Sequence, residues 1–101
     1  MGITIYVTHK NQAEAEKIAD YLLKKKLIAC ATFFPIKSKF WWQGKIQRAN
    51  EIVTLLTTKK QNWLKVKAEI KKLHSYQVPC IEKTEFIAND DYEDWIKKVT
   101  K

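Results

Sequence analysis

The segment that decides the fold runs from Lys37 to Thr58 and reads KSKFWWQGKIQRANEIVTLLTT. Aromatic and β-branched residues lie on both sides of the central Gln43-Gly44 pair, as they do in two strands joined by a tight turn. Glycine adopts the backbone conformations that such turns require, which gives Gly44 a structural role. We therefore predict one long β-hairpin here, and the other elements are interpreted outward from it.

Alternating and helical patterns on either side of the hairpin predict the remaining elements. Residues 3–8 alternate with a period of two, which indicates a half-buried strand, and Asn11 with Glu14 has the spacing of a helix-capping box. Thr58 and Gln61 repeat that spacing before a second apolar stripe. The predicted elements of the first half are a strand at 3–8, a helix at 12–25, a strand at 28–34 closed by Pro35, and the hairpin at 37–58. A helix follows, with Trp63, Val66, Ile70 and Leu73 on its apolar stripe, and then a strand at 78–87 in which Pro79 suits the start or an edge. A terminal helix begins at residue 89 or 90, and its Tyr92, Trp95, Ile96 and Val99 face inward.

This order, β-α-β-β-α-β followed by a short helix, is that of a ferredoxin-like α+β sandwich with a long hairpin between its second and third strands. We expect a single domain, residues 1–101, because the length suits one domain and no linker interrupts the chain. Two cysteines are too few for a disulfide scaffold. Cys30 shares strand parity with Ile28 and Phe34 and is expected in the core, whereas the exposure of Cys80 is left open. With no membrane-length apolar run and no secretory signal pattern, a soluble, cytoplasmic protein without a membrane partner is expected.

The charge balance is strongly basic, with 19 Lys and Arg against 11 Asp and Glu and a net charge of +8. Arg48 is the single arginine, and lysine offers a hydrated point charge where phosphate and base recognition favours the planar guanidinium. The aromatic residues also do not match the stacking motif of RNA-recognition modules. We interpret the lysines as solvent-exposed surface charge and do not expect nucleic acid as a partner. The alternative function is a ferredoxin-like RNA-binding module.

Three consecutive aromatic residues, Phe40, Trp41 and Trp42, are the most unusual part of the hairpin. Neighbouring residues on a strand point to opposite faces, and only one face of a two-layer sandwich meets the helices. One tryptophan would therefore be exposed in a monomer, unless it lies under a loop or the terminal helix. Because exposed aromatic patches mark interfaces, we predict that these three residues make contacts between subunits.

Residues that could carry chemistry are few. No Ser/His/Asp set, paired-histidine spacing or glycine-rich phosphate loop is present, and we do not predict an enzyme. The side chains that could bind a transition metal are His9, His74, Cys30 and Cys80, and none of them is spaced as a Cys-x-x-Cys or His-x-x-x-His pair. His74 directly follows the second predicted helix, where it can act as a C-terminal cation or as a metal ligand.

Three segments, taken in order, resemble the CutA family of divalent-cation tolerance proteins. They are KLIACA at 26–31, SKFWWQGKI at 38–46 followed by Glu51, and HSYQVP at 74–79. The resemblance implies a ferredoxin-like subunit in a tight homotrimer, similar in architecture to the PII nitrogen-signalling proteins. It also implies an association with tolerance of copper and other divalent cations, and no established catalytic activity.

The chain departs from this family at the metal-binding positions. Copper-binding relatives are associated with a Cys where this chain has Val7, and with two adjacent His where it has Leu73 and His74. Only His74 is retained, so we expect weak binding of a copper or zinc ion at most, and no required cofactor. We therefore predict a homotrimeric binding or regulatory protein of divalent metal-ion homeostasis. Candidates for a polar cleft between subunits are Lys45, Glu51 and Tyr76, together with His74; salt bridging and capping are the alternative roles.

Overall fold

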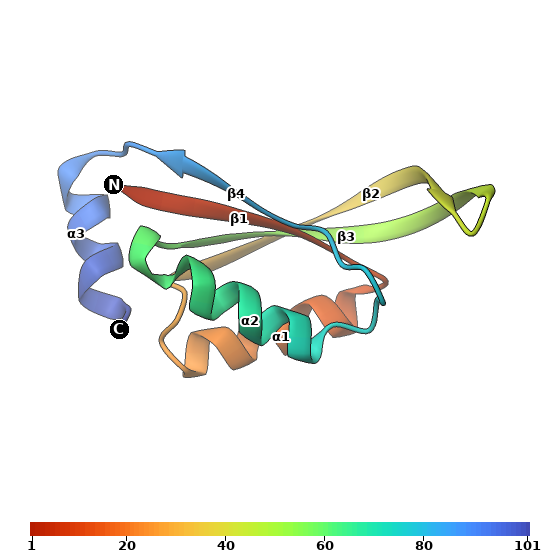
Figure 1. Ribbon diagram of the computed structural model, residues 1–101. Helices are drawn as coiled ribbons and strands as arrows, with labels where there is room; N and C mark the ends of the chain where they lie inside the picture. Colours follow the sequence, from red (N-terminus) through yellow and green to blue (C-terminus); the bar gives the residue numbers. More distant parts are fainter.

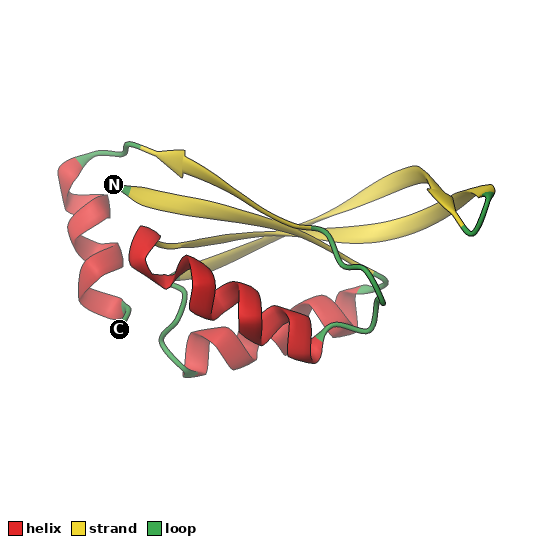
Figure 2. Ribbon diagram, viewed as in Figure 1, coloured by secondary structure: helices red, strands yellow, loops and turns green.

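The computed structural model describes residues 1–101, and Figure 1 shows how they are arranged. The strands are β1 (Gly2–His9), β2 (Cys30–Trp42), β3 (Lys45–Lys59) and β4 (Ile81–Phe86), and the helices are α1 (Gln12–Lys24), α2 (Trp63–Leu73) and α3 (Asp90–Val99). All strand pairs are antiparallel, and the strand order is β2-β3-β1-β4. Helices α1 and α2 cover one face of the sheet, and α3 lies at the end where the chain begins (Figure 2). The predicted ferredoxin-like α+β sandwich is confirmed.

The core lies between β1 and the two covering helices. Alternate side chains of β1, namely Ile3, Ile5 and Val7, are fully buried. Each such side chain contributes roughly 1.5–3 kcal/mol through the apolar surface that it removes from water. They pack with buried residues of the helices, among them Ile18, Leu22, Val66 and Ile70. Because β1 is held between β3 and β4 and beneath both helices, its last residues form a well-fixed platform.

The β2–β3 hairpin runs past the rest of the sheet. Strand β1 pairs with β3 only between residues 52 and 59, whereas β2 pairs with β3 from residue 57 back to residue 45. Residues 36–51 therefore form a two-stranded ribbon, which we call the arm. Figure 1 shows the arm projecting beyond the helices, in a molecule that measures 46 × 23 × 21 Å.

The turn of the arm has positive φ angles at both central residues, 51° at Gln43 and 78° at Gly44. This is the pattern of the mirror-image turns that match the twist of a hairpin. The sequence predicted one exposed tryptophan, but both are exposed in this chain, Trp41 at 72% and Trp42 at 37%. The reason is geometric, because the arm extends past α1 and α2 and the helices therefore cover neither of its faces.

Two predicted strands have the wrong boundaries. Strand β2 does not end at Phe34 but continues through Pro35 to Trp42. An edge strand tolerates proline because its outer side needs no hydrogen-bond donor. Strand β4 begins at Ile81, so Pro79 precedes the strand and residues 74–80 form a loop. That loop carries two of the candidate site residues.

The predicted capping box at Thr58 is also wrong. The Thr58 hydroxyl donates a hydrogen bond to the carbonyl of Leu27 at 2.7 Å, and a 3₁₀ turn at Lys60–Asn62 precedes α2. Thr58 thus closes the link between α1 and β2 instead of starting a helix. Cys30, which was expected in the core, and Cys80 are both half-buried and unpaired.

The terminal helix packs less fully than its apolar residues suggested. Within α3, Ile96 is fully buried, whereas Trp95 is 41% exposed and stacks on Tyr92 with 5.6 Å between ring centroids. Its predicted start near residue 89 or 90 agrees with the observed start at Asp90. No helix of the chain combines the length and the apolar character that crossing a bilayer requires.

Candidate functional site

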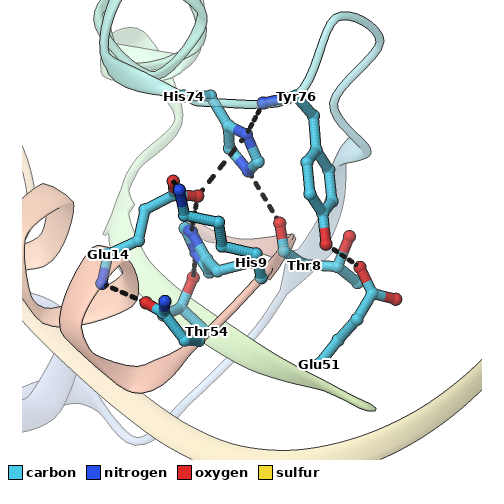
Figure 3. A network of polar contacts seen from close by, with 9 residues as sticks. Thr8, His9, Glu14, Glu51, Thr54, His74 and Tyr76 are labelled. Atoms are coloured by element: carbon cyan, nitrogen blue, oxygen red, sulfur yellow. Dashed lines mark hydrogen bonds and ion pairs between the residues drawn. The ribbon is translucent and has the colours of Figure 1, made fainter. Parts of the chain in front are cut away.

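The loop after α2 meets the end of β1 and the start of α1, which lie more than 60 residues earlier in the sequence (Figure 3). Strand β1 ends at His9, and α1 begins three residues later with Asn11 as its cap, whose side-chain oxygen accepts the Glu14 N–H at 2.9 Å. This confirms the Asn11 half of the predicted capping box and fixes Glu14 in the first helical turn, but the Glu14 carboxylate does not return to the Asn11 N–H. The third segment is the loop after α2, which brings in His74. The Glu14 carboxylate points toward the two imidazole rings (Figure 3).

The two imidazoles and the carboxylate form a compact buried cluster. Glu14 Oε1 lies 3.8 Å from His9 Nδ1 and 3.7 Å from His74 Nδ1. The rings are stacked with 5.1 Å between centroids, and neither histidine side chain is more than 1% exposed. His9 Nδ1 and Glu14 Oε1 are both buried without a hydrogen-bond partner. Since the large majority of buried polar atoms in proteins are paired, these two atoms require an explanation.

The hydrogen bonds of His74 fix its protonation. Its Nε2 lies 2.7 Å from the carbonyl oxygen of Thr8, which can only accept, so Nε2 carries the hydrogen. Its Nδ1 accepts a hydrogen bond from the backbone N–H of Tyr76 at 3.1 Å. Both contacts are satisfied by a neutral ring whose Nδ1 carries the lone pair. This is the tautomer in which Nδ1 can bind an ion.

His9 is also held in a defined environment. Its Nε2 lies 3.0 Å from the hydroxyl of Thr54 on β3, which can donate or accept. Burial, assisted by the neighbouring His74, lowers the pKa of His9 to about 4, and the opposing attraction of Glu14 and Glu51 is smaller. Near neutral pH the ring is therefore uncharged, as metal binding requires.

A second polar pair lies beside this cluster. The Tyr76 hydroxyl donates a hydrogen bond of 2.6 Å to Glu51 Oε2, and Glu51 is only 6% exposed. The Tyr76 ring also tilts against the His74 ring, with 4.8 Å between centroids. Burial and, secondly, the bond to Glu51 raise the pKa of the Tyr76 hydroxyl, so it stays a donor. The sequence candidates His74, Glu51 and Tyr76 therefore lie together within one chain (Figure 3).

Glu51 and Tyr76 line a groove between the loop 75–80 and the arm. Its wall residues include Phe40, Trp41, Arg48, Glu51, Tyr76 and Val78. Lys45, the remaining cleft candidate, is not among them. It pairs with Trp42 at the tip of the arm, six residues from Glu51 along β3, a separation of about 20 Å in an extended strand. Within one chain the structure does not bring Lys45 to this site.

Sequence reasoning missed two members of the cluster. His9 was recognised as a donor but had no partner at a metal-binding spacing, and Glu14 was interpreted only as a capping residue. The partner of both is His74, 65 residues away from His9, so no local spacing encodes the contact. The available signal was the position of His9 and Glu14 on either side of a strand–helix junction.

Comparison with known proteins places the chain among relatives of the same architecture. Residues 3–99 match the family described as CutA1 divalent ion tolerance protein. The chain belongs to this family. The resemblance seen in the sequence is thereby confirmed. CutA1 proteins are named for tolerance and not for a catalysed reaction.

Individual CutA1 relatives match over most of their length. The divalent-cation tolerance protein CutA of Archaeoglobus fulgidus is 49% identical over 77 residues, 76% of each chain. That of Pyrococcus horikoshii is 38% identical over 100 residues, 98% of each chain. The solved A. fulgidus structure, described as a periplasmic divalent cation tolerance protein, has a TM-score of 0.96 at 42% identity and 98% coverage of both chains. Crystalline CutA1 from P. horikoshii has a TM-score of 0.95 at 37% identity and 98% coverage of both chains.

Val7 and Leu73, the two positions at which the sequence departs from the expected metal-binding pattern, have structural roles here. Val7 is fully buried in the core beneath the helices, and Leu73 is 37% exposed at the end of α2. Neither side chain has a donor atom. The ionisable neighbours of His74 are His9, Glu14 and Tyr76.

Proposed function

We propose that the chain is the subunit of a homotrimeric, non-catalytic binding protein that serves in divalent-cation tolerance and takes up an ion such as copper or zinc next to His74. The observation that carries this proposal is the buried His74 ring, whose Nε2 donates to the carbonyl of Thr8, whose Nδ1 accepts the Tyr76 N–H as an uncharged nitrogen, and which faces the Glu14 carboxylate. An uncharged imidazole beside a carboxylate is a donor arrangement suited to divalent transition metals. Membership of the CutA1 family, named for divalent ion tolerance, supports the same role.

The exposed aromatic residues support the trimer. Trp41 is the most exposed of the three on the arm, and Phe40 is 42% exposed. Strands β2 and β4 both lie at the edges of the sheet, where backbone groups are free to pair with another subunit. Association that covers the arm would remove this aromatic surface from water. The groove with Glu51 and Tyr76 would then lie next to the neighbouring subunit, and we propose it as the polar cleft between subunits.

The arm also bears on the RNA-binding alternative. RNA-recognition modules stack bases on aromatic rings at the centre of the sheet. In this chain the rings of Phe40, Trp41 and Trp42 lie on the arm, beyond the part of β3 that pairs with β1. Nothing in the structure favours the RNA-binding alternative, and we retain the metal-tolerance role. We further propose a cytoplasmic location, since the two half-buried cysteines are unpaired and reducing compartments keep thiols in that state.

Native mass spectrometry with a copper and zinc titration tests the proposal, because it reports subunit number and bound ions together. We expect three times the subunit mass of 11.9 kDa and uptake of a divalent ion. Replacement of Trp41 by Lys should give monomers, whereas the matched replacement of Leu64, which is 68% exposed on α2, should leave the trimer intact. A monomer for the unchanged chain, or no ion bound at any concentration tested, contradicts the proposal.

A further inference from the structure

The geometry points to a specific ligand set for the ion. We infer that a borderline divalent cation, of the class of Zn²⁺ and Co²⁺, binds Nδ1 of His9, Oε1 of Glu14 and Nδ1 of His74. The inference rests on the proposed function for its biological setting, and it assigns two ligands, His9 and Glu14, that the family resemblance did not imply. The argument comes from distances, outer hydrogen bonds and unpaired atoms.

The three donor atoms are close enough to share one ion. They all lie within 4.8 Å of one another, and the two distances to Glu14 Oε1 are 3.7 and 3.8 Å. With metal–ligand bonds of about 2.0–2.1 Å, donor atoms around a tetrahedral ion lie about 3.3 Å apart. Three positions would therefore be completed by contraction of a few tenths of an ångström on the Glu14 side and by more between the imidazoles. The rings, whose planes are 18° apart, would also have to tilt so that both Nδ1 lone pairs converge on the ion. The fourth position remains open to water or another ligand.

The outer hydrogen bonds orient both rings for this role. Histidines that bind a metal usually direct the other ring nitrogen to a carboxylate, a backbone carbonyl or water, which fixes tautomer and orientation. A hydroxyl oxygen can accept the ring N–H in the same way. His74 Nε2 meets the carbonyl of Thr8, and His9 Nε2 meets the hydroxyl of Thr54. Both Nδ1 atoms consequently face the Glu14 carboxylate (Figure 3). These contacts are in place before any ion arrives.

The unpaired atoms distinguish an ion site from an ordinary hydrogen-bonded cluster. A proton shared between His9 and Glu14 would bring Nδ1 and Oε1 to about 2.7–2.9 Å. They are 3.8 Å apart, and both atoms are buried without a partner. An ion between them would satisfy both at once. Cys30 and Cys80 lie outside the cluster, so the donor set is two nitrogens and one oxygen, which suits borderline ions better than Cu(I) with its preference for sulfur.

Ion binding would also change the wall of the groove. The His74 Nδ1 lone pair now accepts the Tyr76 N–H at 3.1 Å, and an ion at Nδ1 must displace that bond. The backbone at Tyr76 would then shift, and the same residue donates to Glu51 in the groove wall. The site is thereby connected to the surface on which we propose that subunits meet.

The test is a calorimetric titration of the metal-free protein with Zn²⁺ near neutral pH, followed by Co²⁺ with visible absorption to report its coordination. We expect one ion per chain and the absorption of a four-coordinate N/O site. Glu14→Gln and His9→Gln should each weaken binding at least tenfold, in line with the effect of disturbing a metal site. Glu16→Gln, an exposed carboxylate of the same helix, is the matched control and should bind as the unchanged protein does.

A measurement on the unchanged protein covers the case in which a variant does not fold. In nitrogen NMR spectra, Zn²⁺ should shift Nδ1 of His9 and His74 together with the Tyr76 amide, while the Nε2 hydrogens are retained. If the protein binds zinc but the shifts occur elsewhere, or if folded Glu14→Gln and His9→Gln variants bind as tightly as the control, the ligand set is overturned and the proposed function stands. If the unchanged protein binds no ion, both are overturned.

Discussion

Replacement of Tyr76 by Phe offers a direct measure of the polar pair beside the cluster. The hydroxyl donates the 2.6 Å bond to Glu51 Oε2, and Glu51 is 6% exposed. Hydrogen bonds to charged groups contribute roughly 1.5–3 kcal/mol, and a buried carboxylate that loses its donor retains its desolvation cost. We therefore expect Tyr76→Phe to lower the free energy of unfolding by about 2 kcal/mol.

Tyr21 provides the matched control, because its hydroxyl donates to Glu69 Oε2 at the longer distance of 3.4 Å. The same Tyr→Phe change there should cost less than about 0.5 kcal/mol, since hydrogen bonds weaken with distance. The two variants differ in the same single oxygen atom. The difference between them therefore isolates the short bond from any general effect of removing a hydroxyl.

The assay is urea unfolding of metal-free protein at one fixed subunit concentration, because association with other subunits adds to apparent stability. A double-mutant cycle with Glu51→Ala separates the pair from its surroundings. We expect a coupling energy of about 1–2 kcal/mol between positions 51 and 76. A coupling below about 0.5 kcal/mol, or an equal loss for both tyrosine variants, would refute the argument that this bond stabilises the loop.

Three further predictions address the rest of the chain. Gly44→Ala should lower the free energy of unfolding, measured in urea, by about 1 kcal/mol. The φ of 78° at this position strains any residue that has a Cβ, although no neighbouring atom lies within 4 Å of where the Cβ would be. An unchanged free energy of unfolding would contradict the role of Gly44 in the turn. Gly2→Ala should lower the thermal midpoint, since the new Cβ would lie 2.5 Å from the Phe86 ring, and Gly2→Ala combined with Phe86→Leu should recover part of the loss. The N-terminal ammonium of Met1, with the Ala88 N–H, lowers the pKa of Glu93. The stabilisation that ionised Glu93 gives the fold is therefore present above its ordinary pKa of 4.5 and is lost as the pH falls below that value. Glu93→Gln should lose less free energy of unfolding in acid than the unchanged chain, and equal acid profiles for the two would contradict this assignment.

The fold was predictable because local patterns agreed with the global arrangement. Three local signals each specify one element: the alternation in residues 3–8, the cap at Asn11 and the turn at Gly44. The order of the elements along the chain then predicts a ferredoxin-like sheet. The boundaries that failed were those where tertiary pairing overrides a local signal. Pro35 taken alone indicates the end of a strand. In the structure it lies on the edge strand β2, whose pairing with β3 continues on both sides of the proline.

The candidate site was predictable only in part. His74 and the pair Glu51–Tyr76 came from resemblance to a family, and the structure brings them together. His9 and Glu14 depend on a contact between the first helical turn and a loop 60 residues later, and that contact is created by packing of α1 against α2. A capping-box interpretation assigned the Glu14 carboxylate to the backbone N–H of Asn11, whereas in the structure that carboxylate faces His9 and His74.

The arm has a consequence for local unfolding of the chain. Two-stranded ribbons are marginally stable in water, because a single hairpin buries too little surface. Residues 36–51 lack the third strand that covers the remainder of β3, so in a lone chain they should open without the sandwich unfolding. Amide hydrogens in this stretch would exchange rapidly on dilution and slowly in the assembled protein, while those of β1 would exchange at one slow rate in both. We therefore expect the chain to behave as two cooperative units, which contact with another subunit would merge into one.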